Sequence, residues 1–234
     1  MSDLNFDTAI NVFCDASLTL VNGHYTTCAG YVIVYNDKII ETNHKVIYDS
    51  TNNYAEIYAL KMAISAAVRK VYEIKYSSRI NIFSDSQISV FGLRDWIFSW
   101  YKKLNKDNNM ISDKNVEIAN QDIFNQIVNI IVDNGVPIHI YHQIGHTNCN
   151  NMKDIQKVKI AFSRANKEEI DDDTAYKISY YNYFVDKLTR DNLMSIINSL
   201  AFDINNYQKD IILARRILDD SSMQQYGKLI YRAM

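Results

Sequence analysis

Hydrophobic residues repeat with strand spacing in the first part of the chain and with helical spacing after it. Three runs rich in Val, Ile and Tyr predict consecutive strands at residues 10–14, 29–35 and 38–46. Asn36 and Asp37 tolerate left-handed backbone and bond to their own main chain, so they predict a hairpin between the second and third strands. From Tyr54 to Val71 the apolar residues recur at the spacing of an amphipathic helix.

Further strand and helix patterns follow along the chain. They predict a strand at 79–84, helical material reaching residue 100, an amphipathic helix at 116–132 and a strand at 137–142. Gly135 is placed to end the second helix as a left-handed cap, and Pro137 opens the last strand, where its missing N–H is tolerated. The order predicts an α/β fold in which helices pack on a sheet.

The last third of the chain is less regular. Residues 147–175 are polar and contain the acidic run EEIDDD, so they predict a long mobile insertion, with the acidic run as a solvated loop rather than a third metal site. Residues 180–200 and 203–218 show helical periodicity, and 226–234 add a further turn or two. We expect one domain, 1–189, interrupted by an insertion at 147–181 and followed by a C-terminal helical extension, 190–234.

Charge and cysteine content narrow the functional classes. The formal net charge of −2 means that nucleic acid is not held by overall charge, so any such binding requires local patches or metal ions. The three cysteines are odd in number and lack CxxC spacing, which is typical of reduced thiols rather than of disulfides or a zinc site. The chain has no basic leader and no apolar run approaching ~20 residues. We expect a soluble, cytoplasmic protein without a membrane partner.

Four carboxylates stand in different predicted elements: Asp15 in the first strand, Glu56 at the start of the first helix, Asp85 at the end of the fourth strand and Asp186 in a late helix. An aspartate inside a core strand is costly unless a cation compensates it. Phosphodiester hydrolysis is promoted by two hard cations about 3.5–4 Å apart. Because Mg²⁺ is held by carboxylates and water, the four residues predict a two-metal nuclease site.

Each carboxylate also has a structural alternative. Glu56 could be the capping-box partner of Asn53, and Asp85 could cap the helix that follows the fourth strand. Asp186 could be a solvated helix residue. Asp15 is the hardest to explain structurally, and the ordered context of all four favours a shared site.

Five segments, in chain order, carry a resemblance to a known family. They are CDAS at 14–17, TNNYAEIYAL at 51–60, SDSQISVFGLRDWIFSWYKK at 84–103, IHIYHQIGH at 138–146 and NYFVD at 182–186. The third is the most specific, because the likeness extends through its tryptophan-bearing helix. Together the segments resemble the type 1 ribonuclease H family, within the retroviral-integrase-like superfamily. The resemblance implies the RNase H-like fold: a five-stranded mixed sheet, three antiparallel strands and then parallel strands, flanked by helices.

The resemblance also implies the roles of the site residues. Asp15, Glu56, Asp85 and Asp186 would bind two Mg²⁺ ions, with Mn²⁺ as a substitute. His146 would be the mobile histidine that assists proton transfer or product release, since a histidine gains and loses a proton near neutral pH. His142 is its rival, although strand alternation makes His142 an ordinary half-buried sheet residue.

The substrate implied by the resemblance is an RNA–DNA hybrid. Side-chain amides can bond the 2′-hydroxyl in a wide minor groove, which suits Asn52, Asn53 and Gln87. Asn22, in a longer loop than the family has, is assigned a phosphate or base contact. A basic protrusion would contact the DNA strand through Arg94, Trp96, Trp100, Lys102, Lys103 and Lys106. Trp96 has an alternative as a core residue.

These expectations combine into one activity. The chain is expected to be a magnesium-dependent endonuclease that cuts the RNA strand of hybrids and leaves 5′-phosphate and 3′-hydroxyl ends. Two alternatives stay open. One is a related nuclease for branched DNA or structured RNA, and the other is a non-catalytic nucleic-acid-binding module.

Overall fold

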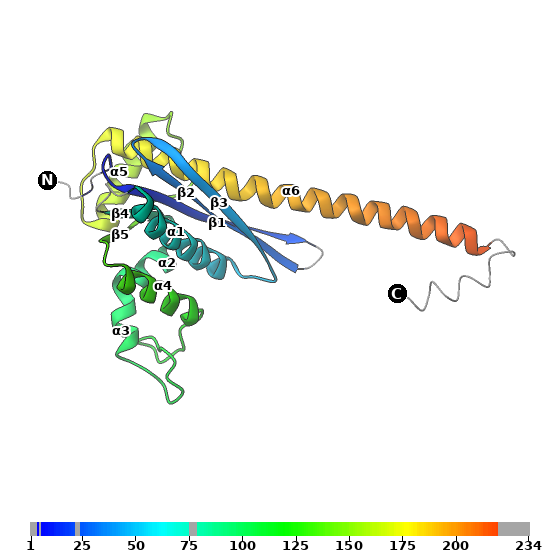
Figure 1. Ribbon diagram of the computed structural model, residues 1–234, viewed down its shortest axis with the longest axis horizontal. Helices are drawn as coiled ribbons and strands as arrows, with labels where there is room; N and C mark the ends of the chain where they lie inside the picture. The colour runs from blue at the N-terminus through cyan, green and yellow to red at the C-terminus, as the bar shows by residue number, and fades with distance from the viewer. Residues whose placement is uncertain (1–3, 5, 22–23, 75–78, 220–234) are drawn as a thin grey trace. The chain divides into compact units, whose positions relative to one another are not determined.

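The computed structural model describes residues 4, 6–21, 24–74 and 79–219. The chain divides into two compact units, residues 1–193 and residues 194–234, which are treated separately. In the first unit (Figure 1) a sheet has the strand order β3-β2-β1-β4-β5. Its strands are β1 Ile10–Val21, β2 His24–Tyr35, β3 Lys38–Tyr48, β4 Ile80–Ser84 and β5 Ile138–His142.

The first three strands form an antiparallel meander, and β4 and β5 run parallel to β1. The predicted five-stranded mixed sheet is therefore confirmed. Asn36 and Asp37 have φ values of 50° and 58°, so they form the expected hairpin turn. β1 extends to Val21, well past its predicted end at Cys14. The prediction stopped at Asp15 because a charged residue breaks the apolar run, yet the strand continues through it.

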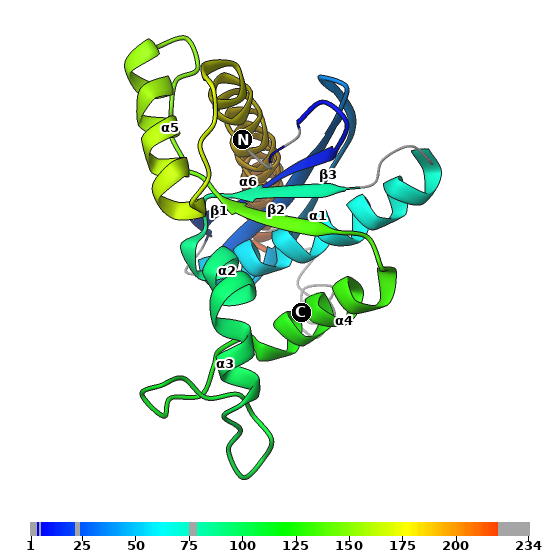
Figure 2. The ribbon, with the colours of Figure 1, turned by 90° about the vertical axis from the view of Figure 1, so that its left-hand side faces the viewer.

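Helices cover both faces of the sheet (Figure 2). One core lies under α1 Asn52–Ile74 and α4 Gln121–Asn134, and it includes the short segments α2 Gln87–Phe91, η1 Gly92–Trp96 and α3 Ile97–Tyr101. η1 is a turn of π-helix. The second core lies under α5 Met152–Asn166 and the first turns of α6 Asp172–Asp219. Gly135 ends α4 with φ of 68°, as predicted.

The prediction of a long mobile insertion at 147–175 is wrong, because α5 occupies most of it. Ile155, Val158 and Phe162 are buried in the second core at helical spacing. Asn151 caps the start of α5 by accepting a hydrogen bond from the Lys153 N–H, and Lys167 ends it in a left-handed conformation with φ of 60°. Polar residues dominate the exposed face of α5, and this composition hid a narrow apolar stripe.

The two C-terminal helices expected at 180–200 and 203–218 form one continuous helix, α6, which begins at Asp172 and reaches Asp219. Asp171 precedes it and accepts a hydrogen bond from the Thr174 N–H at 2.8 Å. The turns predicted at 226–234 lie outside the described residues. Within residues 4–219, apart from the short gaps given above, no helix is long and apolar enough to cross a membrane.

Candidate active site

Asp15 lies in the middle of β1, opposite Gly30 of β2. Gly30 allows α6 to come close, because a Cβ there would lie 2.8 Å from the side chain of Thr189. The hydroxyls of Ser17 and Thr189 are 2.8 Å apart, which ties β1 to the same turn of α6. Asp186 stands three residues before Thr189, so this contact brings the late helix to the strand that carries Asp15.

Asp85 follows the last residue of β4 and lies against the loop after β5. Gly145 leaves room for this side chain, since a Cβ on Gly145 would overlap the Asp85 carboxylate oxygen Oδ2 and the carboxylate would have to shift. His142 Nε2 lies 3.2 Å from the main-chain oxygen of Asp85. The Gln143 N–H donates to Ser84 at 3.1 Å and extends the pairing of β4 and β5 to the site.

Glu56 projects from the second turn of α1 and is held by hydrogen bonds. The Asn52 amide donates to Glu56 Oε1 at 2.6 Å, and the Ser86 hydroxyl donates to Oε2. The helix caps are other residues: Thr51 accepts from the Tyr54 N–H at 3.2 Å, and Ser86 accepts from the Ser89 N–H at 3.3 Å. The capping alternatives for Glu56 and Asp85 are therefore wrong.

The four carboxylates interact electrostatically. Burial raises the pKa of the Asp15 carboxyl to about 8, and the charge of Asp85 adds to this effect while the Ala16 N–H opposes it. Asp186 and Glu56 also raise the pKa of Asp15. Burial and then the charge of Glu56 raise the pKa of Asp85, and Asp186 acts in the same direction. Like charges that lie near a carboxyl raise its pKa, so these effects on Asp15 and Asp85 indicate that the structure places the four predicted residues near one another.

The donor set fits a hard divalent cation, because it consists of carboxylate oxygens held partly out of water. In the part of the chain that the structure describes, no three acidic, histidine or cysteine side chains are already arranged as a metal cage. Glu56 is turned toward Asn52 and Ser86, and Asp186 pairs with Arg190 at 2.9 Å. Cation binding would thus require these side chains to exchange partners.

A cavity of about 550 Å³ lies beside this cluster and is lined by both His146 and Asp186. His146 is exposed on a left-handed turn with φ of 56°, and its charge lowers the pKa of Asp85. His142, its rival in the sequence, is 6% exposed, and its burial lowers its pKa. The geometry therefore favours His146 as the histidine that faces solvent and substrate.

Asp154 lines the same cavity and is a second possible acidic partner. Its carboxylate accepts hydrogen bonds from Lys157 at 2.8 Å and from the Asn148 N–H at 3.2 Å, and both lower its pKa. Asp186, in contrast, raises the pKa of both Asp15 and Asp85. Asp186 is therefore the fourth member of the cluster.

The proposed substrate residues divide into exposed and buried positions. Asn52, Asn53 and Gln87 are exposed. Trp96 is 43% exposed, so it is not the core residue that its helical spacing allowed. Trp100 is 8% exposed and its ring packs edge-on against Phe124. Trp100 is therefore a core residue, and its predicted role in substrate binding is wrong.

The cations of the predicted protrusion differ in their pairing. Lys102 and Lys103 are both exposed, and Lys103 pairs with Asp113 at 2.5 Å. Arg94 is bound by its own neighbours rather than open to substrate. Asn22 lies outside the described residues.

Three residues of the site escaped sequence reasoning: Ser86, Arg190 and Gln143. Gln143 is buried, donates to Asn182, and leaves its Oε1 without a hydrogen-bond partner among the described residues. Asn182 lies one turn before Asp186 on α6. A lone glutamine after a strand carries no sequence signal, whereas Ser86 and Arg190 each lie next to or one turn from a predicted carboxylate.

The five-stranded mixed sheet with helices on both faces is the RNase H-like fold. A sequence model of the RNase H family matches residues 7–161, so the chain belongs to the RNase H family and is a ribonuclease H. The match ends within α5, before Asp186. A comparison with curated proteins gave no match.

Several solved structures are similar to this chain. The foamy viral protease-reverse transcriptase in complex with an RNA/DNA hybrid is 16% identical with a TM-score of 0.49, and the match covers 69% of this chain and 20% of that one. RNase H1 from Halobacterium salinarum NRC-1 is 18% identical with a TM-score of 0.39, covering 58% and 86%. LC11-RNase H1 in complex with an RNA/DNA hybrid is 18% identical with a TM-score of 0.43, covering 66% and 97%. This chain thus spans about a fifth of the viral protein.

Proposed function

We propose that this ribonuclease H is a divalent-cation-dependent endonuclease that hydrolyses the RNA strand of RNA–DNA hybrids. The observation that carries the proposal is the cluster of Asp15, Glu56, Asp85 and Asp186, whose burial and mutual repulsion raise the pKa of Asp15 and Asp85. Such a cluster is unfavourable without a compensating cation, and it lies at the carboxyl end of β4. Neighbouring acidic groups with raised pKa values are typical of a functional site.

The four carboxylates would hold two Mg²⁺ ions, with Mn²⁺ as a substitute. When bound, the ions supply the positive charge that activates a water molecule and stabilises the leaving 3′-oxygen. Neighbouring residues position two of these carboxylates for cation binding. Ser86 and Asn52 orient Glu56 through its two oxygens, and Gly145 gives the Asp85 carboxylate room to reach the site.

His146 is the proposed proton carrier. It is exposed at the mouth of the cavity that Asp186 also lines, and its left-handed turn follows directly after Gly145. An imidazole in this position can act as a general acid toward the departing 3′-oxygen.

Recognition of the hybrid is assigned to the exposed amides around the cluster. Asn52, Asn53 and Gln87 are donors and acceptors that can bond a ribose 2′-hydroxyl, the group that distinguishes RNA from DNA. Asn52 also donates to Glu56, so substrate contact and carboxylate orientation are linked in one side chain. Trp96 and Lys102, both exposed, provide an aromatic surface and a cation for the DNA strand.

The test is a substrate panel of labelled RNA–DNA hybrid, duplex RNA, duplex DNA and branched DNA, each incubated with Mg²⁺, Mn²⁺ or EDTA. We expect cleavage of the RNA strand of the hybrid alone, only with a divalent ion, giving 5′-phosphate ends. An intact hybrid, or faster cutting of branched DNA or duplex RNA, would overturn the substrate assignment. Product formation in EDTA would overturn the cation requirement.

A further inference from the structure

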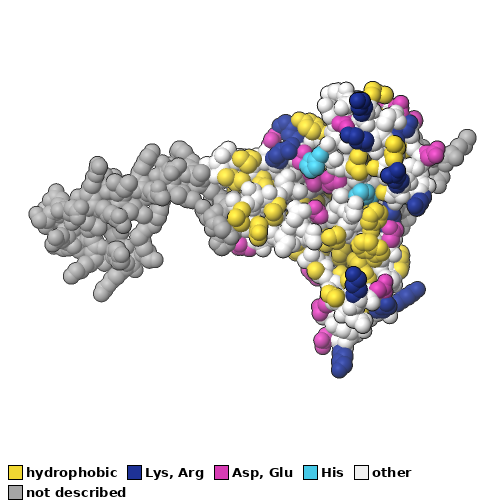
Figure 3. Space-filling model, turned by 180° about the vertical axis from the view of Figure 1, so that it is seen from behind, with side chains coloured by type: hydrophobic (Ala, Val, Ile, Leu, Met, Phe, Trp, Pro, Cys, Tyr) yellow, Lys and Arg dark blue, Asp and Glu magenta, His cyan; other side chains and the backbone are white. Residues whose placement is uncertain are grey.

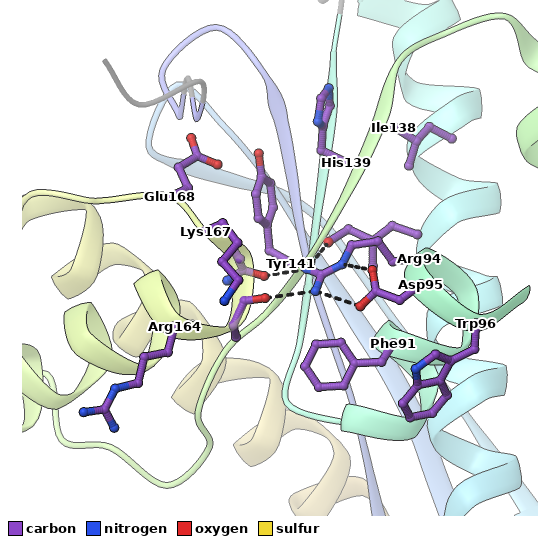
Figure 4. A pocket seen from close by; sticks show the side chains of 13 residues that line it. Phe91, Arg94, Asp95, Trp96, Ile138, His139, Tyr141, Arg164, Lys167 and Glu168 are labelled. Atoms are coloured by element: carbon purple, nitrogen blue, oxygen red, sulfur yellow. Dashed lines mark hydrogen bonds and ion pairs between the residues drawn. The ribbon is translucent and has the colours of Figure 1, made fainter.

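A second cavity, of about 800 Å³, lies outside the active site along the edge strand of the sheet (Figure 4). One wall is the end of α5 and the residues after it, the floor is β5, and the other wall is formed by Phe91 and η1. We call this cavity the α5–η1 groove. In Figure 4, Arg164 and Lys167 stand on the α5 side, and Phe91 and Trp96 stand on the opposite side.

The cations of the groove fall into two kinds. Arg94, in η1, is held in place, because its guanidinium donates to Asp95, to Asn166 at 2.8 Å and to the main-chain oxygen of Ala165 at 2.9 Å. Arg164 and Lys167 are exposed, and their side chains make no hydrogen bond or ion pair with any residue that the structure describes. These two cations are therefore available to an anionic ligand.

The acidic residues of the groove are already engaged. Asp95 accepts both of its ion-pair contacts from Arg94, at 2.9 and 3.1 Å. Glu168 accepts a hydrogen bond from the main-chain N–H of Leu4. The charge that the groove offers to solvent is therefore positive.

The opposite wall offers aromatic surface. Trp96 is 43% exposed, and its ring lies 6.1 Å from that of Phe91. Phe91 directly precedes η1 and Trp96 is its last residue, and π-helical turns occur frequently at functional sites. Aromatic rings facing unpaired cations are the usual surface for a nucleic acid backbone, where rings pack on sugars or bases and cations meet phosphates.

The groove adjoins the carboxylate cluster through two aromatic rings. The Phe91 ring lies 5.2 Å from the His142 ring, and His142 Nε2 lies 3.2 Å from the main-chain oxygen of Asp85. In the other direction Trp96 leads through α3 to Lys102 and Lys103. On the face of the molecule seen in Figure 3, Lys and Arg side chains lie on both sides of a group of hydrophobic side chains.

We propose that the α5–η1 groove binds the phosphate backbone of the hybrid's DNA strand, with Arg164 and Lys167 as the phosphate contacts. This inference rests on the proposed function and deepens it. The groove needs α5 for one wall, so the insertion at 147–181 lengthens the substrate footprint beyond the carboxylate cluster.

The test compares hybrid binding by two proteins that both carry Asp85→Asn to prevent cleavage. One has no other change, and the other adds Arg164→Gln with Lys167→Asn, since asparagine tolerates the left-handed backbone at Lys167. With a hybrid of about 20 base pairs we expect binding about 10-fold weaker at low salt, because two phosphate contacts are lost. The slope of log K against log salt should decrease in magnitude by about 1.8.

Two controls make the result specific. The charge-conserving pair Arg164→Lys with Lys167→Arg should bind nearly as the parent does. Lys38→Gln, at the hairpin on the opposite edge strand, removes an exposed cation and should change neither affinity nor slope. Equal affinity and equal slope for parent and double variant would overturn the groove proposal while leaving the proposed function intact. A parent that does not bind the hybrid at all would instead overturn the proposed function, and this inference with it.

Discussion

The acidic cluster of the active site and the single acidic residue Glu41 have opposite electrostatic surroundings. In the active site, Asp15 and Asp85 have acidic neighbours, and burial together with repulsion raises their pKa values. On the outer surface, Glu41 lies 2.6 Å from Arg69 and 3.2 Å from Lys70. Burial alone would raise the pKa of Glu41, but hydrogen bonds from Tyr31, Arg69 and Lys70 outweigh it and lower that pKa.

The contrast separates structural from functional acidic groups. Glu41 has its counter-ions within the chain, so its charge is compatible with the fold as it stands. Among the residues that the structure describes, the only ion-pair partner of these active-site carboxylates is Arg190 at Asp186, so the fold holds them at a cost in stability. Residues kept in an unfavourable arrangement of this kind are explained by a ligand of opposite charge.

The largest effect is expected from Asp85→Asn. This change removes a central carboxylate, and the loss of several kcal/mol of charge stabilisation should lower the cleavage rate by about 1000-fold or more. Because one of the repelling charges is removed, the melting temperature without divalent ions should rise. Rates on a labelled hybrid and thermal melts in EDTA measure the two effects. If the variant cleaved the hybrid at the parental rate, Asp85 would not be an active-site residue.

Gly145→Ala moves a carboxylate without changing any charge. The added Cβ overlaps Asp85 Oδ2, so Asp85 must shift, and a displacement of about 1 Å can lower a rate about 100-fold. Gly135→Ala is the matched control. Gly135 also has no side chain, but its surroundings are open and its φ is 68°, so alanine there should lower the melting temperature and leave the rate unchanged. Equal rates for Gly145→Ala and the parent would contradict the assigned packing.

Stability without divalent ions should fall as pH rises. The pKa of Asp15 is raised in the folded state to about 8 from 3.8, so folding favours its protonated form. Its contribution is fully present below the unfolded pKa and is lost as pH rises through about 8. Thermal melts between pH 5 and 8 in EDTA should show this loss, and Mg²⁺ should reduce it. In Asp15→Asn the pH dependence should be flatter, and an unchanged slope would count against the raised pKa.

Glu41→Gln should have the smallest effect. The pKa of Glu41 is lowered in the folded state, so its contribution is present above the ordinary glutamate pKa and is lost as pH falls. Arg69 is half exposed, and exposed ion pairs contribute about 0.2–1 kcal/mol, so the free energy of unfolding should fall by less than about 1 kcal/mol at neutral pH. Chemical denaturation measures this change. The cleavage rate should not change. A large loss of activity would show that Glu41 contributes to catalysis or substrate binding.

Much of this architecture could be predicted from sequence because local patterns determine it. Asn36-Asp37 and Gly135 act through backbone conformations that few other residues adopt, and both were located correctly. The four carboxylates could be named because each interrupts an apolar run or begins a motif. Their convergence depends on strand order, and the likeness of five separated segments to one family supplied that order.

Other features depend on contacts that no local pattern reports. The apolar stripe of α5 is narrow, and only its burial against the second core distinguishes it from a solvated loop. Trp96 and Trp100 lie one helical turn apart in the same motif, yet Trp96, the last residue of η1, is 43% exposed and Trp100, in α3, is 8% exposed. The engagement of Arg94 by Asn166 and Ala165 requires α5, so it could not be foreseen from the motif that contains Arg94.

Asn166 has a consequence for the behaviour of the protein at high concentration. Its side chain accepts from the His142 N–H at 3.0 Å and donates to the His142 carbonyl at 2.8 Å, as a neighbouring backbone would. A terminal strand with open amide and carbonyl groups invites pairing with another molecule and then aggregation. At the end of β5 that lies beside the active site, the Asn166 side-chain amide occupies the position of a neighbouring strand. Edge-to-edge polymerisation through His142 would therefore first have to displace the end of α5.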